Sequence, residues 1–359
     1  MRTIRTRVIK VDPVNPDVGL LRSVAEVIRS GGLVVFPTET VYGLGANAYD
    51  AKAVIKIFKA KERPIDNPLI VHINSINQLV NLTSEQPEEM FIIAKKFWPG
   101  PITVVLPKSK RVPKEVTAGL PTIAVRMPAH PVALKLIELS GVPIAAPSAN
   151  LSGKPSPTTS EHVIRDMYGR VDIIIDAGET LFGVESTIID LTHRPPVLLR
   201  PGAIPVEEIE KVLNIEIKIP AFARGLIEAE KALAPGLKYK HYAPEKALIL
   251  IESSNYSNYE EYARKVMNIT QDYIKKGLRV VILASKETSG YYMSKGFKVI
   301  TLGSRRNIFE VAKNLFKILR IIDEMNVDMA ICEGFEEKGL GLAIMNRLRK
   351  ASGYNIIKV

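Results

Sequence analysis

The hydrophobic periodicity of this chain breaks down between residues 219 and 246, and that break constrains the fold most. Proline, glycine and polar residues dominate there, but APGLKYKHYAPEK is too rich in Tyr, Lys and His for a plain spacer. A chain of 359 residues also exceeds the usual size of one hydrophobic core. We therefore expect a first domain at 1–205, an interdomain linker at 206–246 and a second domain at 247–359.

Short apolar runs alternate with amphipathic stretches throughout the second domain. Strands are expected at 247–251, 279–283, 298–302 and 329–333, and helices at 260–275, 308–324 and 342–350, with a short helix after the second strand. Strands that alternate with helices indicate a parallel sheet covered on both faces. The second domain is therefore predicted to be Rossmann-like and α/β.

One glycine-rich turn of this domain, GFEEKGLGLAIMNR, lies between a predicted strand and a helix, where an anion could bind. Its spacing does not match a dinucleotide fingerprint, and the sequence contains no GxxxxGK[ST] motif. The pattern favours a tight turn that starts a helix. A nucleotide-binding or regulatory role for the second domain stays open as an alternative.

The first domain is predicted to contain a mixed sheet. Asp50 can cap a helix in which Val54, Ile57 and Phe58 share one face, and a second helix is expected at 88–97. Some neighbouring strands have no helix between them, which argues against a purely parallel sheet. The expected strands are 33–36, 69–73, 102–106, 123–127, 143–146, 172–176, 186–190 and 197–199.

The composition limits where the chain works and what it binds. No apolar run is long enough to cross a bilayer or act as a signal peptide, and the single cysteine, Cys332, excludes an internal disulfide. We expect a cytoplasmic protein with no membrane partner, and nothing demands assembly beyond a monomer. The net charge of +11 suits polyanionic partners, but the basic residues are scattered, which favours a solvated surface.

Polar residues gather in four segments of the first domain. PTETVYGLG follows the first strand and places small hydroxyls beside glycines, as in a loop that approaches a ligand or in an ordinary capped turn. KIFKAKERPIDNPLIVH crowds Lys56, Lys59, Lys61 and Arg63 around a helix end. Those cations can clamp a triphosphate, or they can simply offset the helix dipole.

The other two segments follow later strands. Arg126 ends a strand in RMPAHPV, where it could bind a carboxylate or form a surface salt bridge. PIAAPSANLSGKPSPTT interleaves serines and threonines with prolines just after an apolar strand. Prolines stiffen such a loop while hydroxyls and backbone N–H groups can face a ligand, although a disordered linker has a similar composition.

These segments, together with WPGPIT, GVESTIID and LRPG, resemble the YrdC-like threonylcarbamoyl-AMP synthase family. They occur in the family's order, and the KYKHYAP linker and Rossmann-like tail resemble its longer, two-domain form. The resemblance implies a twisted mixed sheet whose helices form a concave basic pocket. It also implies that threonine, bicarbonate and ATP give threonylcarbamoyl-adenylate and pyrophosphate. A separate complex would then transfer the threonylcarbamoyl group to tRNA.

The chemistry implied by the family needs no covalent nucleophile. A carbamate formed from threonine and bicarbonate can attack the α-phosphorus of ATP, so the protein must align the reactants and neutralise phosphate charge. We expect Mg²⁺ to accompany ATP, held mainly by phosphates and water rather than by protein side chains. An RNA-binding protein that uses the basic surface remains the alternative, and weak RNA binding is kept as a further partner class.

Residue roles follow from the resemblance, motif by motif. The motifs assign threonine to Thr40, His72, Arg126, the backbone at Ala146, and Ser186. They assign ATP to Arg63, Asn67, Thr122, Ser148, Ser156 and Arg200, with Tyr242 of the linker closing over it. Weaker candidates for phosphate contact are Lys56, Lys59 and Lys61.

Overall fold

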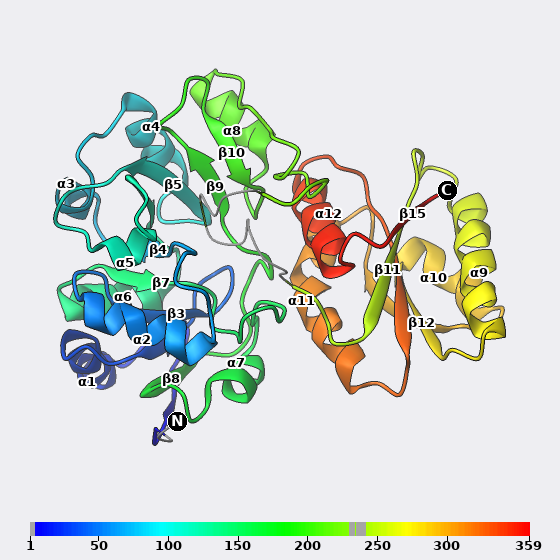
Figure 1. The fold of residues 1–359 in the computed structure, drawn as a ribbon, viewed down its shortest axis with the longest axis horizontal. Helices are drawn as coiled ribbons and strands as arrows, with labels where there is room; N and C mark the ends of the chain where they lie inside the picture. Colours follow the sequence, from blue (N-terminus) through cyan, green and yellow to red (C-terminus); the bar gives the residue numbers. More distant parts are fainter. Residues whose placement is uncertain (1–3, 230–233, 235–241) are drawn as a thin grey trace.

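The computed structural model describes residues 4–229, 234 and 242–359, which build two α/β domains, each around its own sheet (Figure 1). The first sheet has ten strands and the second has five. In spatial order the first sheet consists of β1 (Arg7–Lys10), β8 (Ile173–Asp176), β2 (Val34–Phe36), β3 (Gly43–Asn47), β7 (Ile144–Ala146), β4 (Ile70–His72), β6 (Thr122–Arg126), β5 (Ile102–Pro107), β9 (Thr187–Asp190) and β10 (Val197–Arg200).

The first sheet is mixed, as expected from strands that follow one another without a helix. β2 and β3 are antiparallel, whereas β4 and β6 are parallel. Two apolar clusters pack on its two sides. The helices of this domain are α1 (Val18–Arg29), α2 (Ala51–Lys61), η1 (Ile76–Gln78), α3 (Leu79–Leu82), α4 (Glu88–Phe97), α5 (Lys114–Thr117), α6 (Pro131–Ser140), α7 (Ser160–Met167) and α8 (Val206–Leu213).

Local sequence signals explain why α2 begins where it does. The Asp50 side chain accepts hydrogen bonds from the backbone N–H groups of Lys52 and Ala53, which satisfies two donors of the first turn. Val54, Ile57 and Phe58 are buried, as their spacing predicts. The cap and the apolar spacing together fix where α2 starts and which face it buries.

The second half of PTETVYGLG is a strand rather than a loop. Gly43 and Gly45 belong to β3, which pairs with β2. A Cβ at Gly45 would lie 2.7 Å from a ring carbon of Phe36 and 2.6 Å from Cγ2 of Ile144. Gly45 is therefore required by close packing inside the sheet, and only the start of this motif is free to form a binding loop.

The linker predicted at 206–246 begins with regular structure. Residues 206–213 form α8, and its apolar face (Val206, Ile209 and Leu213) belongs to the core of the first domain. The spacing of these three residues is that of an amphipathic helix. The bounds of the two domains stay predictions, and residues 230–233 and 235–241 lie outside the described structure.

The second sheet is entirely parallel, as predicted, with the order β13 (Lys298–Gly303), β12 (Val280–Ser285), β14 (Met329–Glu333), β11 (Ala247–Glu252), β15 (Ile356–Lys358). In Figure 1, α9 (Tyr259–Lys275) and α10 (Lys286–Met293) lie on its outer side, and α11 (Ile308–Glu324) and α12 (Leu340–Ala351) lie between it and the first domain. Among the described residues, no helix has both the length and the apolar character needed to cross a bilayer.

The inner helices of the second domain pack tightly on the first domain. Gly183 has a φ of +71°, and a Cβ there would lie 2.4 Å from Cα of Lys313 on α11. Val41 and Val184 of the first domain share one apolar cluster with Phe316 and Leu319 of α11. The two domains therefore share part of one apolar core across their interface.

Candidate functional site

A cavity opens in the first domain where the loop after β2, the strands β4 and β6, and the loop after β7 meet. The sheet order brings them together, because β7, β4 and β6 are neighbours. The register places His72 beside Arg126 and Ile70 beside Ala146. The predicted site residues in the cavity lining are Thr40, Lys61, Arg63, His72, Arg126, Ala146, Ser148, Ser156, Ser186, Arg200 and Tyr242.

Arg126 is buried at the end of β6 and held from three sides. Its Nη2 lies 2.6 Å from Oε1 of Glu39, and its Nη1 donates to Oγ1 of Thr40 over 2.9 Å. Its Nε donates to the carbonyl of Gly100. A salt bridge this deeply buried is not the surface pair that the sequence left open, and it fixes the orientation of the guanidinium.

His72 is a neutral imidazole at neutral pH. Burial, helped by the nearby Arg126 cation, lowers the pKa of His72 to about 3. Its ring packs edge-to-face against Phe36, with centroids 5.8 Å apart. Within the described part of the chain, its Nδ1 has no hydrogen-bond partner. His72 can therefore offer a hydrogen bond to a ligand in the cavity without adding charge.

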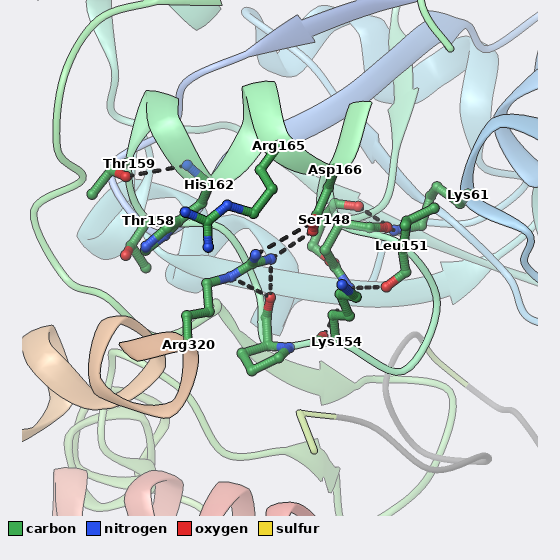
Figure 2. Close-up of polar contacts among 12 residues, drawn as sticks. Lys61, Ser148, Leu151, Lys154, Thr158, Thr159, His162, Arg165, Asp166 and Arg320 are labelled. Carbon is green, nitrogen blue, oxygen red and sulfur yellow. Dashed lines mark hydrogen bonds and ion pairs between the residues drawn. The ribbon is translucent and has the colours of Figure 1, made fainter. Parts of the chain in front are cut away.

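The Ser/Pro-rich loop after β7 is held by internal hydrogen bonds, and the Lys61 side chain contacts it (Figure 2). Lys61 Nζ donates to the carbonyl oxygens of Ser148 and Asn150. The Ser148 hydroxyl donates to Oδ1 of Asn150 over 2.6 Å, and Nδ2 of Asn150 donates to the Lys154 carbonyl over 2.9 Å. This loop is therefore a fixed wall of the cavity and not a disordered linker.

Lys61 is itself almost completely buried, at 1% exposure. Burial, with the Arg63 cation nearby, holds the pKa of Lys61 well below its usual value. Its hydrogen bonds to two loop carbonyls tie the end of α2 to the Ser/Pro-rich loop.

Glu185, from GVESTIID, links the cavity to the second domain. Its Oε1 accepts a 2.7 Å hydrogen bond from the Ser156 hydroxyl, and its Oε2 lies 2.9 Å from Nη2 of Arg347 on α12. Burial alone would raise the pKa of Glu185, but Arg347 and Arg200 together with Ser156 lower it to about 2. The carboxylate therefore stays ionised and holds a cavity serine against a residue of the other domain.

Arg200 and Ser186 form a second buried pair in the cavity wall. Nη2 of Arg200 donates to Oγ of Ser186 over 3.1 Å and to its carbonyl oxygen over 3.0 Å. The Ser186 hydroxyl also lies 2.7 Å from that of Thr103 on β5. The three residues join β9, β10 and β5 at the same end of the sheet.

Tyr242 is the described part of the linker motif that reaches the cavity. Its ring stacks on Phe316 of α11 at 5.1 Å, and the Arg347 guanidinium lies 5.6 Å from the ring centroid. Burial raises the pKa of Tyr242 to about 12. The linker therefore brings an aromatic side chain to the cavity from the side of the second domain, while the KYKH residues before Tyr242 lie outside the described structure.

The remaining predicted residues do not line the cavity. Lys56 and Lys59 are exposed, and Lys56 Nζ donates to the Gly31 carbonyl over 2.6 Å, so these two cations occupy the outer face of α2. Thr122 lies at the start of β6 and is half-buried. Asn67 is buried behind Arg63, whose Nη2 lies 3.4 Å from its carbonyl oxygen.

Three residues that carry the site were not assigned from the sequence. Glu39 and Glu185 occur in motifs that pointed to the site, but their partners could not be named. Arg347 lies 162 positions from Glu185, in the glycine-rich segment that was interpreted as a turn and helix start. The only sequence signal for these pairs is that the residues are charged, and charge alone does not show which residues are buried or which partner each one has.

Comparison with known proteins identifies the family. A model described as telomere recombination matches residues 26–202, and one described as the C-terminal domain of threonylcarbamoyl-AMP synthase matches residues 204–353. The threonylcarbamoyl-AMP synthase of Pyrococcus abyssi is 56% identical over 94% of this chain and 96% of its own length. The chain belongs to the Sua5-type threonylcarbamoyl-AMP synthases, in their two-domain form.

Two further relatives agree over the whole length. The Bacillus subtilis threonylcarbamoyl-AMP synthase is 46% identical across all of both chains. The crystal structure of P. abyssi Sua5 complexed with L-threonine aligns with a TM-score of 0.90 at 53% identity, covering 98% of this chain and 99% of that one. This chain is thus a threonylcarbamoyl-AMP synthase, a nucleotidyltransferase of threonylcarbamoyladenosine biosynthesis.

Proposed function

We propose that the cavity of the first domain is the concave basic pocket where L-threonine, bicarbonate and ATP become threonylcarbamoyl-adenylate and pyrophosphate. This proposal rests on one observation: residues from separate motifs, spread between positions 40 and 242, line the same cavity. Its lining includes the cations Lys61, Arg63, Arg126 and Arg200. Such a set suits anionic substrates.

Threonine is assigned to the side of the cavity around Arg126. That guanidinium is fixed by Glu39 and Thr40, so it can face the threonine carboxylate without reorganising. The neutral His72 and the hydroxyl of Ser186 supply uncharged hydrogen-bonding groups for the amine and side chain. The backbone at Ala146 completes this side, beside Ile70 of the neighbouring strand.

ATP is assigned to the side formed by the Ser/Pro-rich loop. Ser148, Ser156, Arg63, Arg200 and Tyr242 all line the cavity, and we assign Tyr242 to cover the bound nucleotide. Lys61 acts mainly by holding the loop, since its ammonium already contacts two carbonyl oxygens. Asn67 is kept as an ATP candidate because its buried side-chain amide has no hydrogen-bond partner among the described residues. Thr122, Lys56 and Lys59 have no comparable support.

Mg²⁺ fits this cavity only as a companion of ATP. Glu185 is the carboxylate in the lining, and Ser156 and Arg347 already engage its two oxygens. The described residues contain no cluster of three acidic, histidine or cysteine side chains that could hold an ion alone. Phosphates and water would therefore supply most ligands, and the ion would neutralise phosphate charge.

The residues act by alignment and charge, because the substrates provide their own nucleophile. A carbamate oxygen attacks the α-phosphorus, and pyrophosphate leaves as the new P–O bond forms. Fixed donors such as the Arg126 and Arg200 guanidiniums stabilise the charge that develops. Alignment of bound reactants can itself lower such a barrier by about 7–11 kcal/mol.

Pyrophosphate release tests this proposal directly. Release should require ATP, threonine and bicarbonate together, and omission of any one should abolish it, while RNA should be dispensable. Arg126→Ala should abolish threonine-dependent release, because it leaves the carboxylate without its cation. Near-normal release by that variant would contradict the assignment of Arg126. A requirement for RNA would favour the RNA-binding alternative. The cytoplasmic location, the monomeric state and the downstream transfer complex stay predictions from the sequence.

A further inference from the structure

A second cavity lies in the second domain, outside the site described above. It has a volume of about 400 Å³, and its lining comes from the loops after β11, β13 and β14. All three loops lie at the carboxyl ends of parallel strands. The GFEEKG turn, for which the sequence left an anion site open, supplies Phe335, Glu336 and Lys338 to the lining.

The sheet topology makes this end of the domain a place where ligands bind. β12 and β14 are neighbours, but α10 leads from β12 to β13 on one side, and α12 leads from β14 to β15 on the other. In open α/β sheets, ligands bind in the crevice at the carboxyl ends of strands where the connections diverge in this way. The position of the cavity therefore points to a ligand before its chemistry is considered.

The floor of this cavity is a fully bonded buried ion pair. Arg305 Nη2 lies 2.8 Å from Oε2 of Glu333, whose side chain is completely buried. Arg305 Nε donates to Oγ of Ser285, and the Arg305 guanidinium lies 4.6 Å from the ring centroid of Phe335 and 5.0 Å from that of Tyr256. This network holds the three loops in a fixed arrangement, so the cavity is preformed.

The rim of the cavity carries cations without carboxylate partners. Arg306 and Lys338 come from opposite loops, and both are exposed. Among the residues that the structure describes, no carboxylate lies within ion-pair distance of either side chain. Glu336 also lines the cavity, but Arg306 and Lys338 together leave an excess of positive charge that favours an anion, and the guanidinium geometry of Arg306 suits phosphate oxygens.

Aromatic and apolar side chains form the remaining wall. Tyr259 and Ile308 of α11 are both half-buried and line the cavity, together with the buried Phe335. Flat apolar rings beside cations are the combination that binds a base and its phosphate in single nucleotides and in single-stranded RNA. We propose that this cavity binds a nucleotide, with its phosphate between Arg306 and Lys338 and its base against Tyr259 and Ile308.

Equilibrium dialysis of the full chain with radiolabelled ATP, without threonine or bicarbonate, tests this proposal. The wild type should bind two ATP molecules per chain, and Arg306→Ala/Lys338→Ala should bind one, with at least a tenfold loss of affinity at the second site. Arg264→Ala/Lys295→Ala is the matched control, since it removes an exposed arginine and lysine of the same domain away from the cavity. The control should still bind two.

A second arm separates a free nucleotide from a nucleotide of RNA. An anticodon stem–loop RNA is titrated into the same three proteins. Loss of RNA binding in Arg306→Ala/Lys338→Ala alone, with a single ATP bound by every protein, would support the cavity and identify RNA as its source of nucleotide. One ATP per wild-type chain and equal RNA binding by all three proteins would overturn the proposal.

Pyrophosphate release separates this proposal from the function assigned to the first cavity. Neither Arg306 nor Lys338 lines the first cavity, so release by the double variant should equal that of the wild type. In a different outcome, the wild type releases no pyrophosphate while the double variant still loses binding of ATP or RNA. That result would support the nucleotide site in the second cavity and contradict the function proposed for the first.

Discussion

The buried ion pair between Arg320 and Asp166 offers the sharpest test of how the second domain supports the site. Arg320 on α11 places Nη2 2.7 Å from Oδ2 of Asp166 on α7 (Figure 2). The same nitrogen donates to the Pro155 carbonyl over 2.6 Å, directly before Ser156 of the cavity. Replacing Arg320 by methionine keeps an unbranched apolar stem but removes the guanidinium, with its charge and its donors.

The structure sets the expected loss of stability. The Asp166 side chain is 1% exposed, so Arg320→Met leaves a carboxylate buried without its cation. Breaking a buried pair from one side destabilises a protein by about 3–5 kcal/mol. His162 lies beside the pair and can take up a proton, which would offset part of that loss. We therefore expect the free energy of unfolding to fall by about 3 kcal/mol at neutral pH.

The same two helices provide the control. Arg165 of α7 pairs with Glu324 of α11 at the surface, where both side chains are more than half exposed. Exposed pairs contribute little to stability. Arg165→Met should therefore unfold close to the wild type, although it too removes one arginine from the α7–α11 contact. The comparison isolates burial as the cause of the difference.

Guanidinium unfolding followed by tryptophan fluorescence measures the effect, because the single tryptophan, Trp98, lies in the first domain. Far-UV circular dichroism reports both domains together, so agreement between the two signals checks for a single transition. Arg320→Met should also raise the KM for ATP more than it lowers kcat, because Pro155 positions Ser156. Equal denaturation midpoints for Arg320→Met and Arg165→Met would refute this reasoning.

Three further substitutions test separate features. Lys61→Met should raise the KM for ATP at least tenfold, because the Ser/Pro-rich loop loses its support, whereas Lys56→Met on the outer face of α2 should leave steady-state kinetics unchanged. Gly141→Ala should cost roughly 1–2 kcal/mol of left-handed backbone strain. Gly183→Ala should destabilise the chain by more than that, because only at Gly183 does the new Cβ meet backbone atoms. Equal losses of stability in thermal unfolding would argue against that contact. Burial and then Arg320 lower the pKa of His162 to about 4, below its unfolded value near 6.5, so wild-type stability should fall as pH drops from 6.5 to 4. His162→Gln should lose less stability than the wild type over that range, and parallel losses would contradict the assigned pKa.

Helices with strong local signals were predictable from the sequence alone. α4 and α11 have the expected bounds, 88–97 and 308–324, because apolar periodicity and their end signals lie within the helices themselves. α6 was missed even though Pro131 starts it and Gly141 follows its end. Those two signals lie beside RMPAHPV, a segment that was interpreted through its arginine.

The membership of the site was largely predictable, but its geometry was not. The motifs named His72 and Arg126, yet only the pairing of β4 with β6, which are separated in the chain by other elements, places them side by side. The outer position of Lys56 and Lys59 was equally hidden, because helical spacing does not reveal which side of α2 faces the cavity. Sheet order is a long-range property, and no local pattern specifies it.

The second domain cannot be treated as a separable module, because two of its arginines pair with buried carboxylates of the first domain. Arg347 neutralises Glu185, and Arg320 neutralises Asp166, each from an inner helix of that domain. A chain cut after residue 246 would remove the arginine partners of both carboxylates. It would also expose Val41 and Val184, which share an apolar cluster with α11. Loss of activity in such a truncation would therefore follow from damage to the pocket whether or not the domain has a role of its own. Point substitutions such as Arg320→Met and Arg306→Ala/Lys338→Ala separate these two cases, because the first acts on the interface and the second acts on the distant cavity.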